Sequence, residues 1–114
     1  MATLGEITYQ RGDTDPIAIT VKSDGVPVDI TGWVLTLTVN TEKAPVDDTN
    51  QVFQLTGILD ADPTTGRVSF QPTEVQTDLV GTYYYDIQRV DASGFIKTIQ
   101  PPTKIKFAQD ITKI

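Results

Sequence analysis

The side chains best suited to chemistry in this chain are its carboxylates, since it has 15 acidic residues, no His and no Cys. Asp47, Asp48, Asp60 and Asp62 lie near one another in the sequence and raise a calcium-site hypothesis, because Ca²⁺ binds several carboxylate oxygens at one point. Their spacing does not match an EF-hand loop, and aspartates in turns commonly hydrogen-bond their own backbone. We therefore favour the turn interpretation and predict no metal site.

Other catalytic chemistry finds little support in the sequence. The missing His and Cys exclude the commonest general base, a thiolate nucleophile and sulfur-ligated zinc. A carboxylate pair for glycoside hydrolysis could be drawn from any two acidic residues, but nothing distinguishes one pair from another. We predict a protein that is not an enzyme and has no cofactor. A small hydrolase stays open only as an alternative that needs carboxylates clustered in a concave pocket.

One further motif, Arg11-Gly12-Asp13, matches the tripeptide that integrins recognise at an exposed loop tip. A structural role explains the same residues more simply. Gly12 permits a sharp bend, and Asp13 can cap or close a turn before Pro16. We interpret the motif as a turn and not as an adhesion site.

Composition predicts that β-strands position these side chains. Thr, Ile and Val number 18, 11 and 11, whereas Ala, Leu and Glu together number 15, so strand formers greatly outnumber helix formers. The chain of 114 residues has the length of one ordinary domain, and we expect residues 1–114 to form one. The net charge of −6 opposes binding to nucleic acids and anionic membranes, and no signal peptide or membrane span is visible.

Alternation of apolar and polar residues, broken at short intervals by Gly, Pro and Asp, predicts an all-β fold of about seven antiparallel strands in two sheets. The clearest strand is residues 33–40, whose odd-numbered side chains should face the core. Residues 26–28 contain a proline, which favours an edge strand, and residues 41–50 should form a polar loop. The strands are predicted at residues 6–10, 16–22, 26–28, 33–40, 51–57, 67–71, 81–90 and from 95 to 108, with a bulge or a switch between sheets at Pro101-Pro102.

Residues 72–80 are the one place where the sequence predicts helical structure. They begin with Pro-Thr-Glu, and Thr73 is expected to cap a single helical turn. Val75 and Leu79 are four residues apart and should lie on one face of that turn.

Two later strands carry specific expectations about which side chains are exposed. Tyr83 and Tyr85 should enter the core, while Tyr84 points outward and is free to contact another molecule. Lys104 and Lys106 should be edge charges that block unwanted strand pairing.

The segment Leu79-x-Gly81-x-Tyr83-x-Tyr85 resembles the tyrosine-corner region of immunoglobulin-like domains, in which a tyrosine hydroxyl bonds to nearby backbone before a late strand. The resemblance implies an immunoglobulin-like β-sandwich with Trp33 as its core tryptophan. Tyr85 stands where antibody domains carry their second cysteine, so the antibody branch is excluded.

Several short sequence motifs, taken in their order along the chain, indicate a narrower family. They are Arg11-Gly12-Asp13-Thr14, Pro27-Val28-Asp29-Ile30-Thr31-Gly32-Trp33, Thr65-Gly66-Arg67-Val68 and Gly81-Thr82-Tyr83-Tyr84. From about Gly5 to Phe107 the chain resembles the N-terminal immunoglobulin-like domain of phage baseplate upper proteins and related small virion proteins of tailed phages.

The resemblance implies a structural subunit of a tailed-phage virion, made in the host cytoplasm, that acts by protein–protein assembly. Head decoration, neck, tail and baseplate accessory or adaptor roles all remain open. The implied partners are other virion proteins and copies of the chain in a symmetric assembly, with no nucleic acid and no membrane. The segments with the least internal patterning, together with Tyr84, are the candidate contact residues: Ala2, Thr3, Leu4, Glu6, Pro45, Val46, Asp47, Asp48, Tyr84, Ile111 and Ile114.

The alternative function is a carbohydrate-binding accessory module, with a host-surface glycan as its ligand. Such a module would stack a sugar on exposed aromatic side chains. Two of Tyr84, Phe95 and Phe53 lying coplanar and exposed on one face would favour it.

Overall fold

The computed structural model describes residues 5–45 and 49–109, and its regular structure is almost entirely β. The 3-10 turn η1 (Pro63–Thr65) is the one helical element in this part of the chain. No helix within these residues is long and apolar enough to cross a membrane. The strands are β1 (Ile7–Gln10), β2 (Ile17–Thr20), β3 (Lys22–Ser23), β4 (Val26–Pro27), β5 (Val34–Asn40), β6 (Gln51–Thr56), β7 (Ile58–Leu59), β8 (Arg67–Phe70), β9 (Gly81–Val90) and β10 (Ile96–Ala108).

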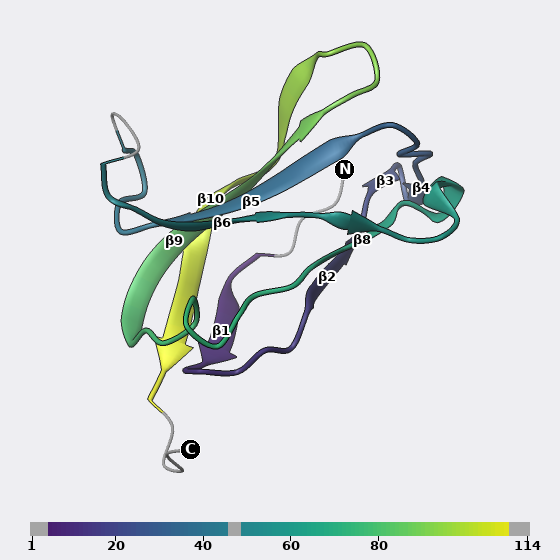
Figure 1. Cartoon of the computed structure of the whole chain (residues 1–114). Helices are drawn as coiled ribbons and strands as arrows, with labels where there is room; N and C mark the ends of the chain where they lie inside the picture. The colour runs from purple at the N-terminus through teal and green to yellow at the C-terminus, as the bar shows by residue number, and fades with distance from the viewer. Residues whose placement is uncertain (1–4, 46–48, 110–114) are drawn as a thin grey trace.

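These strands form two facing sheets and a small hairpin (Figure 1). The larger sheet has five strands in the order β1-β10-β9-β5-β6, and the smaller sheet has three in the order β2-β8-β7. β3 and β4 form the hairpin. The chain passes from the larger to the smaller sheet at Gly57, where a Cβ atom would lie 2.6 Å from Val68 Cγ2. The predicted two-sheet β-sandwich is confirmed.

The two sheets bury their inward-facing apolar side chains against each other. On β5, Leu35, Leu37 and Val39 are fully buried, as the alternation in the sequence predicts. On β8, Phe70 is fully buried as well. The buried apolar core consists of Tyr9, Ile19, Val21, Ile30, Leu35, Leu37, Val39, Phe53, Leu55, Val68, Phe70, Tyr85, Ile87, Ile99, Ile105 and Phe107.

The last strand lies inside the larger sheet and not at its edge. β1 runs parallel to β10, with Ile7 opposite Ile105, although the sequence predicts antiparallel strands. β10 is therefore flanked by β1 and β9. Lys104 and Lys106 are exposed on its outer face, so the prediction that they guard an edge is wrong. Alternation along one strand shows which side chains are buried, but it does not show which strands are neighbours.

β10 is one continuous strand of 13 residues. The Pro101-Pro102 pair is accommodated by register shifts against β9 on either side of Gln100. Gln100 is buried, and its amide nitrogen lies 3.1 Å from both Pro101 O and Thr103 Oγ1. The predicted bulge is confirmed. Proline lacks the N–H that a regular ladder requires, which explains its position.

Within residues 72–80, residues 74–77 form a single turn closed by a hydrogen bond from the Thr77 N–H to Thr73 O at 3.1 Å, and no regular helix is present. Thr73 acts as the predicted cap, because its Oγ1 accepts a hydrogen bond from the backbone N–H three residues later. Val75 is 86 % exposed whereas Leu79 packs against the core, so the prediction that the two side chains share one face is wrong. Thr77 is buried instead and donates to Asp13 O at 2.8 Å, which ties this segment to the turn after β1.

Trp33 is half-buried and precedes β5, so the expected core tryptophan is wrong. It packs against the margin of the core, and the Arg89 guanidinium lies over its ring at 4.9 Å. Arg89 Nη1 also donates to Phe95 O at 2.7 Å and lies 3.2 Å from Asp91 Oδ2. The tryptophan thus supports the arginine that braces the β9–β10 hairpin.

The buried tyrosines fasten the N-terminal segment to the sandwich. The hydroxyl of Tyr85 donates to the carbonyl oxygen of Gly5, 80 residues away in the sequence. Tyr9 makes a more local bond, from its hydroxyl to Asp15 O at 2.6 Å. Burial raises the pKa of both phenols to about 12, and the charges of Asp15 and Asp13 add to the effect at Tyr9.

Candidate interaction surface

Three of the predicted contact residues lie in the described part of the chain. Glu6 is exposed and precedes β1. Pro45 and Tyr84 come from distant parts of the sequence, but they line the same hollow. The other predicted contact residues lie outside the described residues: Ala2, Thr3, Leu4, Val46, Asp47, Asp48, Ile111 and Ile114.

The hollow has a volume of about 290 Å³ and lies on the outer face of the five-stranded sheet, which points away from the smaller sheet. Side chains alternate along a strand, so the even-numbered residues of β9 face outward while Tyr85 and Ile87 are buried. Residues of β5, β6 and β9, the loop after β5 and one proline of β10 surround the hollow. They are Thr38, Asn40, Glu42, Lys43, Pro45, Gln51, Gln54, Tyr84, Tyr85, Asp86, Gln88 and Pro102.

Strand register brings these side chains together. Thr38 on β5 lies opposite Asp86 on β9 and opposite Gln54 on β6. The amide nitrogen of Gln54 donates to Thr38 Oγ1 at 3.1 Å. Asn40 is buried, and its Oδ1 accepts a bond from the N–H of Glu42 at 2.8 Å, which holds the start of the loop beside the hollow.

Asp86 is the residue of the hollow that the sequence reasoning missed. Its carboxyl group is half-buried, and burial raises its pKa above the ordinary value of 3.8. No described residue forms a hydrogen bond or an ion pair with this carboxyl group. Aspartate is depleted in strands, so an aspartate in the middle of a clear strand is the signal that would have identified it.

The Arg11-Gly12-Asp13 turn is held by the segment that packs against it. Arg11 Nε lies 2.6 Å from Asp78 Oδ1, and Gly12 donates its N–H to Thr77 O at 3.0 Å. Thr77 in turn donates its hydroxyl to Asp13 O. These contacts engage all three residues within the chain and support the interpretation of the motif as a turn.

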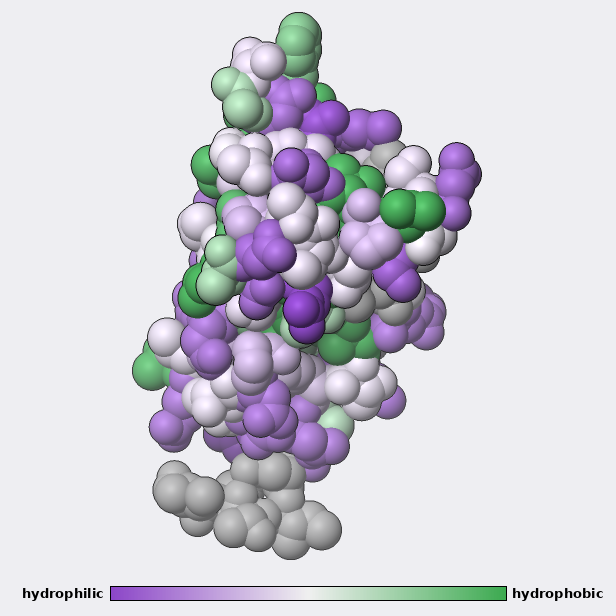
Figure 2. All heavy atoms as spheres, turned by 90° about the vertical axis from the view of Figure 1, so that its right-hand side faces the viewer, coloured by the Kyte–Doolittle hydropathy of each residue, from purple (hydrophilic) through white to green (hydrophobic). Residues whose placement is uncertain are grey.

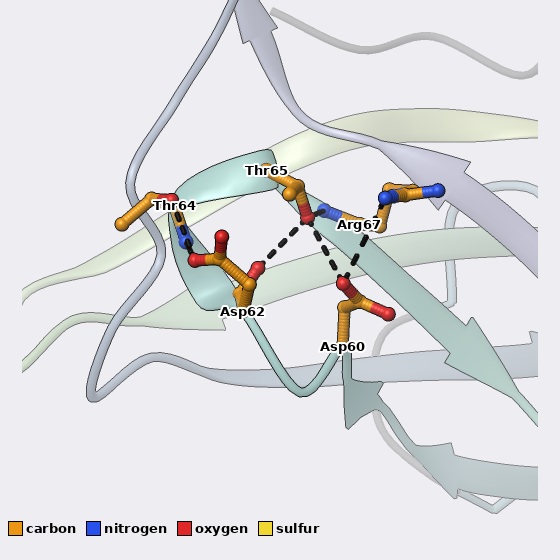
Figure 3. Close-up of polar contacts among 5 residues, drawn as sticks. All are labelled: Asp60, Asp62, Thr64, Thr65 and Arg67. Atoms are coloured by element: carbon orange, nitrogen blue, oxygen red, sulfur yellow. Dashed lines mark hydrogen bonds and ion pairs between the residues drawn. The ribbon is translucent and has the colours of Figure 1, made fainter.

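The aspartates before β8 hydrogen-bond within their own turn (Figure 3). Asp62 Oδ1 accepts bonds from the N–H of Thr64 at 3.1 Å and from its hydroxyl at 2.6 Å. Asp60 Oδ2 lies 3.4 Å from Thr65 Oγ1 and 3.9 Å from Arg67 Nη2. In residues 5–45 and 49–109, no three His, Cys, Asp or Glu side chains gather as metal ligands. Turn formation accounts for both aspartates.

A second exposed feature lies farther along the outer face, next to the turn of the β9–β10 hairpin. This hairpin projects from the sandwich (Figure 1). Val34 is opposite Val90, and Val90 is opposite Ile96, so the three side chains form an apolar row across β5, β9 and β10. They are 53 %, 37 % and 70 % exposed. By contrast, on the side of the molecule in Figure 2, apolar and hydrophilic residues are interspersed.

The three aromatic residues considered for sugar stacking do not share a surface. Phe53 is buried on the inner side of β6, and Tyr84 is half-buried on the outer face. Phe95 is 70 % exposed and lies next to Ile96, which pairs with Val90. Val90 is six residues along β9 from Tyr84, or about 20 Å at the rise of a strand. These residues therefore form no coplanar exposed pair.

The fold is similar to that of other β-sandwich proteins. Superposition on CopC from Methylosinus trichosporium OB3b gives a TM-score of 0.52 at 12% sequence identity, over 96% of this chain and 90% of that chain. Murine CRIg gives a TM-score of 0.40 at 14% identity, over 92% of each chain. The likeness to CopC shows a shared β-sandwich fold and nothing about function. No curated protein matches the chain.

The family assignment comes from the sequence as a whole. Residues 2–110 match the BppU N-terminal domain, which covers nearly the whole chain. This agrees with the order of motifs from Arg11-Gly12-Asp13-Thr14 to Gly81-Thr82-Tyr83-Tyr84, and it identifies a phage baseplate structural domain and not an enzyme family. The chain therefore belongs to the BppU N-terminal domain family of phage baseplate upper proteins.

Proposed function

We propose that this chain is a structural subunit of a tailed-phage baseplate, or of an adjoining part of the virion, and that it acts by binding other virion proteins. The observation that carries the proposal is the family match over residues 2–110. The chain would serve as an accessory or adaptor subunit present in several copies. Repetition in a symmetric particle makes individually modest contacts sufficient through effective concentration.

The outer face of the five-stranded sheet is the surface best suited to such contacts. It combines the hollow around Asp86 with the apolar row of Val34, Val90 and Ile96. A specific interface buries about 800 Å² per partner and joins an apolar centre to polar surroundings. The hollow and the apolar row lie on one side of one sheet, about four residues apart along β9, so a single partner could cover both.

The direct test is quantitative mass spectrometry of purified phage particles that carry this gene. We expect the chain in a fixed ratio to known baseplate proteins, because a structural subunit occupies symmetry-related positions. Its absence from purified particles would contradict the proposal.

Cross-linking of the same particles tests which surface makes the contacts. Lys43 lines the hollow, and Lys104 lies opposite Tyr84 on the outer face. Lys22 lies on the β3–β4 hairpin, on the inner side of this sheet near Arg89 and Lys97, and is the internal control. We expect cross-links to neighbouring subunits from Lys43 and Lys104. Cross-links from Lys22 alone would contradict the choice of surface.

A further inference from the structure

We propose that the hollow on the outer face binds an arginine side chain of a partner protein, with its guanidinium group paired to Asp86. The inference rests on the proposed assembly role and adds the chemistry of the contact.

The carboxylate is the first line of evidence. Asp86 lies near the middle of β9 and is half-buried among the strands and the loop that form the hollow. No described residue pairs with it, although buried charged groups in proteins are normally paired. A cation that enters the hollow would replace the water that burial removes from this carboxylate.

The surrounding groups favour a guanidinium over an ammonium ion. A guanidinium is planar, carries five N–H donors and stacks on aromatic rings. Tyr84 lies two residues from Asp86 on the same face of β9 and also lines the hollow. Gln54 uses its amide nitrogen to bond Thr38, so its amide oxygen is available as a further acceptor in the lining of the hollow. The oxygen acceptors and the tyrosine in this lining suit the planar, multiply donating guanidinium of arginine better than the compact ammonium group of lysine.

The charge of the chain favours a cation supplied by a partner. The net charge is −6, and the cationic side chain that lines the hollow is Lys43. Lys43 is exposed on the loop and forms no ion pair with Asp86. A divalent metal ion would need several converging oxygen ligands. In residues 5–45 and 49–109, no three His, Cys, Asp or Glu side chains lie close enough together to hold one.

NMR titration of the isotopically labelled chain tests the binding. The probes are N-acetyl-arginine methylamide, the lysine analogue and the uncharged citrulline analogue. We expect saturable shifts of the Thr38, Tyr84 and Asp86 amide signals with the arginine probe and weaker shifts with the lysine probe. The citrulline probe has nearly the same shape but no charge, so it should cause no saturable shift. Equal responses to the arginine and citrulline probes, or no saturable response, would overturn the inference.

Variants assign the binding to the carboxylate. Asp86→Asn should lower the affinity for the arginine probe at least tenfold. Asp24→Asn makes the same charge change in the β3–β4 turn, where φ is 51° and Asn is well tolerated, so it should leave the affinity unchanged. Lys43→Ala should raise the affinity by removing a positive charge that repels the probe from the lining of the hollow. An Asp86→Asn chain that binds as well as the unaltered chain would overturn the inference.

Incorporation into phage particles separates this inference from the proposed function. We expect Asp86→Asn to be depleted from particles relative to Asp24→Asn. Equal incorporation of the two variants would overturn the partner arginine while leaving the structural role intact. If the unaltered chain were missing from particles, the proposed function would fail, whereas the NMR titration would still decide whether the hollow binds a guanidinium.

Discussion

Tyr85 and Asp86 are neighbours on β9 but lie on opposite faces of the five-stranded sheet. Tyr85 is 1 % exposed, packs in the core and donates its hydroxyl to the carbonyl oxygen of Gly5. Asp86 faces the other way into the hollow and is half-buried without a described partner. The Tyr85 hydroxyl thus has its hydrogen bond within the chain, whereas the Asp86 carboxyl group on the outer face has no described partner.

The difference indicates what each face does. A group that helps to hold the fold together normally has its hydrogen bonds completed within the chain, as the Tyr85 hydroxyl does, because an unsatisfied buried group costs free energy. A half-buried carboxylate without a partner lowers stability slightly, and it is available to a ligand. Substitutions on the inner face should therefore change the free energy of unfolding strongly, and substitutions at Asp86 should change binding more than stability.

The largest effect on stability should come from Leu37→Ala. Leu37 is fully buried between the sheets, and removing its side chain leaves a cavity. We expect the free energy of unfolding to fall by about 2–5 kcal/mol. Urea denaturation followed by Trp33 fluorescence measures it. Thr36→Ala, one residue away on the outer face, should cost less than about 1 kcal/mol. Similar costs for the two variants would contradict the assignment of inner and outer faces.

Gly57→Ala should have the next largest effect. Its Cβ would lie 2.6 Å from Val68 Cγ2, 3.2 Å from Phe70 Cε1 and 3.3 Å from Leu35 Cβ, all in the core between the sheets. Overpacking of this kind costs about 1–3 kcal/mol. The same urea experiment measures it, with Thr56→Ala on the exposed side of β6 as the control. An unchanged denaturation midpoint would contradict the close packing around Gly57, because it would show that the core accommodates an added methyl group there.

Tyr85→Phe should reduce stability by about 1 kcal/mol, because it removes a hydrogen bond and leaves the Gly5 carbonyl without its phenolic donor. Thermal denaturation followed by circular dichroism measures the change. Tyr84→Phe on the outer face is the matched control, and it should have a smaller effect. Equal losses of stability in the two variants would mean that the hydrogen bond from Tyr85 to Gly5 contributes no measurable stability.

Alkaline pH should destabilise the chain through the same tyrosines. The pKa values of Tyr9 and Tyr85 are raised from 10.0 to about 12 in the folded state. At pH values between these two pKa values the folded state binds more protons than the unfolded state. The contribution of the two tyrosines to stability is therefore fully present below about pH 10 and is lost as the pH rises through about 12. Ultraviolet titration of tyrosinate absorbance should show two late-ionising groups. Ionisation of all tyrosines near 10 would contradict their burial.

Asp86→Asn should have the smallest effect on stability, and of opposite sign. The folded-state pKa of Asp86 is raised by burial, so its favourable contribution is present below the unfolded value of 3.8 and is lost as the pH rises. At neutral pH the variant should therefore be more stable by up to about 0.5 kcal/mol, and the gain should disappear in acid.

Asp29→Asn is the matched comparison for Asp86→Asn. Hydrogen bonds from the side chain and then the backbone N–H of Thr31 lower the pKa of Asp29, so its contribution is present above the ordinary pKa and is lost in acid. Asp29→Asn should thus reduce stability at neutral pH. Urea denaturation at neutral and acid pH distinguishes the two variants. A gain in stability at neutral pH for both variants would contradict the different surroundings described for the two carboxyl groups.

Much of the fold could be predicted because local patterns coincide with single strands. The strand predicted at residues 81–90 is β9 with the same bounds, and the bulge at Pro101-Pro102 follows from the missing N–H groups of proline. Trp33 is less buried than its resemblance to a core tryptophan predicts. It directly precedes the first residue of β5, where periodicity no longer determines which way a side chain faces.

The sequence by itself determined the β class, the inward and outward sides of most strands and the family, because these depend on residue type and short-range spacing. Only the tertiary structure decided that β1 pairs in parallel with β10, that Tyr85 reaches Gly5 and that Asp86 shares a hollow with Tyr84 and Pro45. These contacts join segments far apart in the chain. They arise from the register and order of strands, which are set by packing of the whole sandwich and not by any one segment.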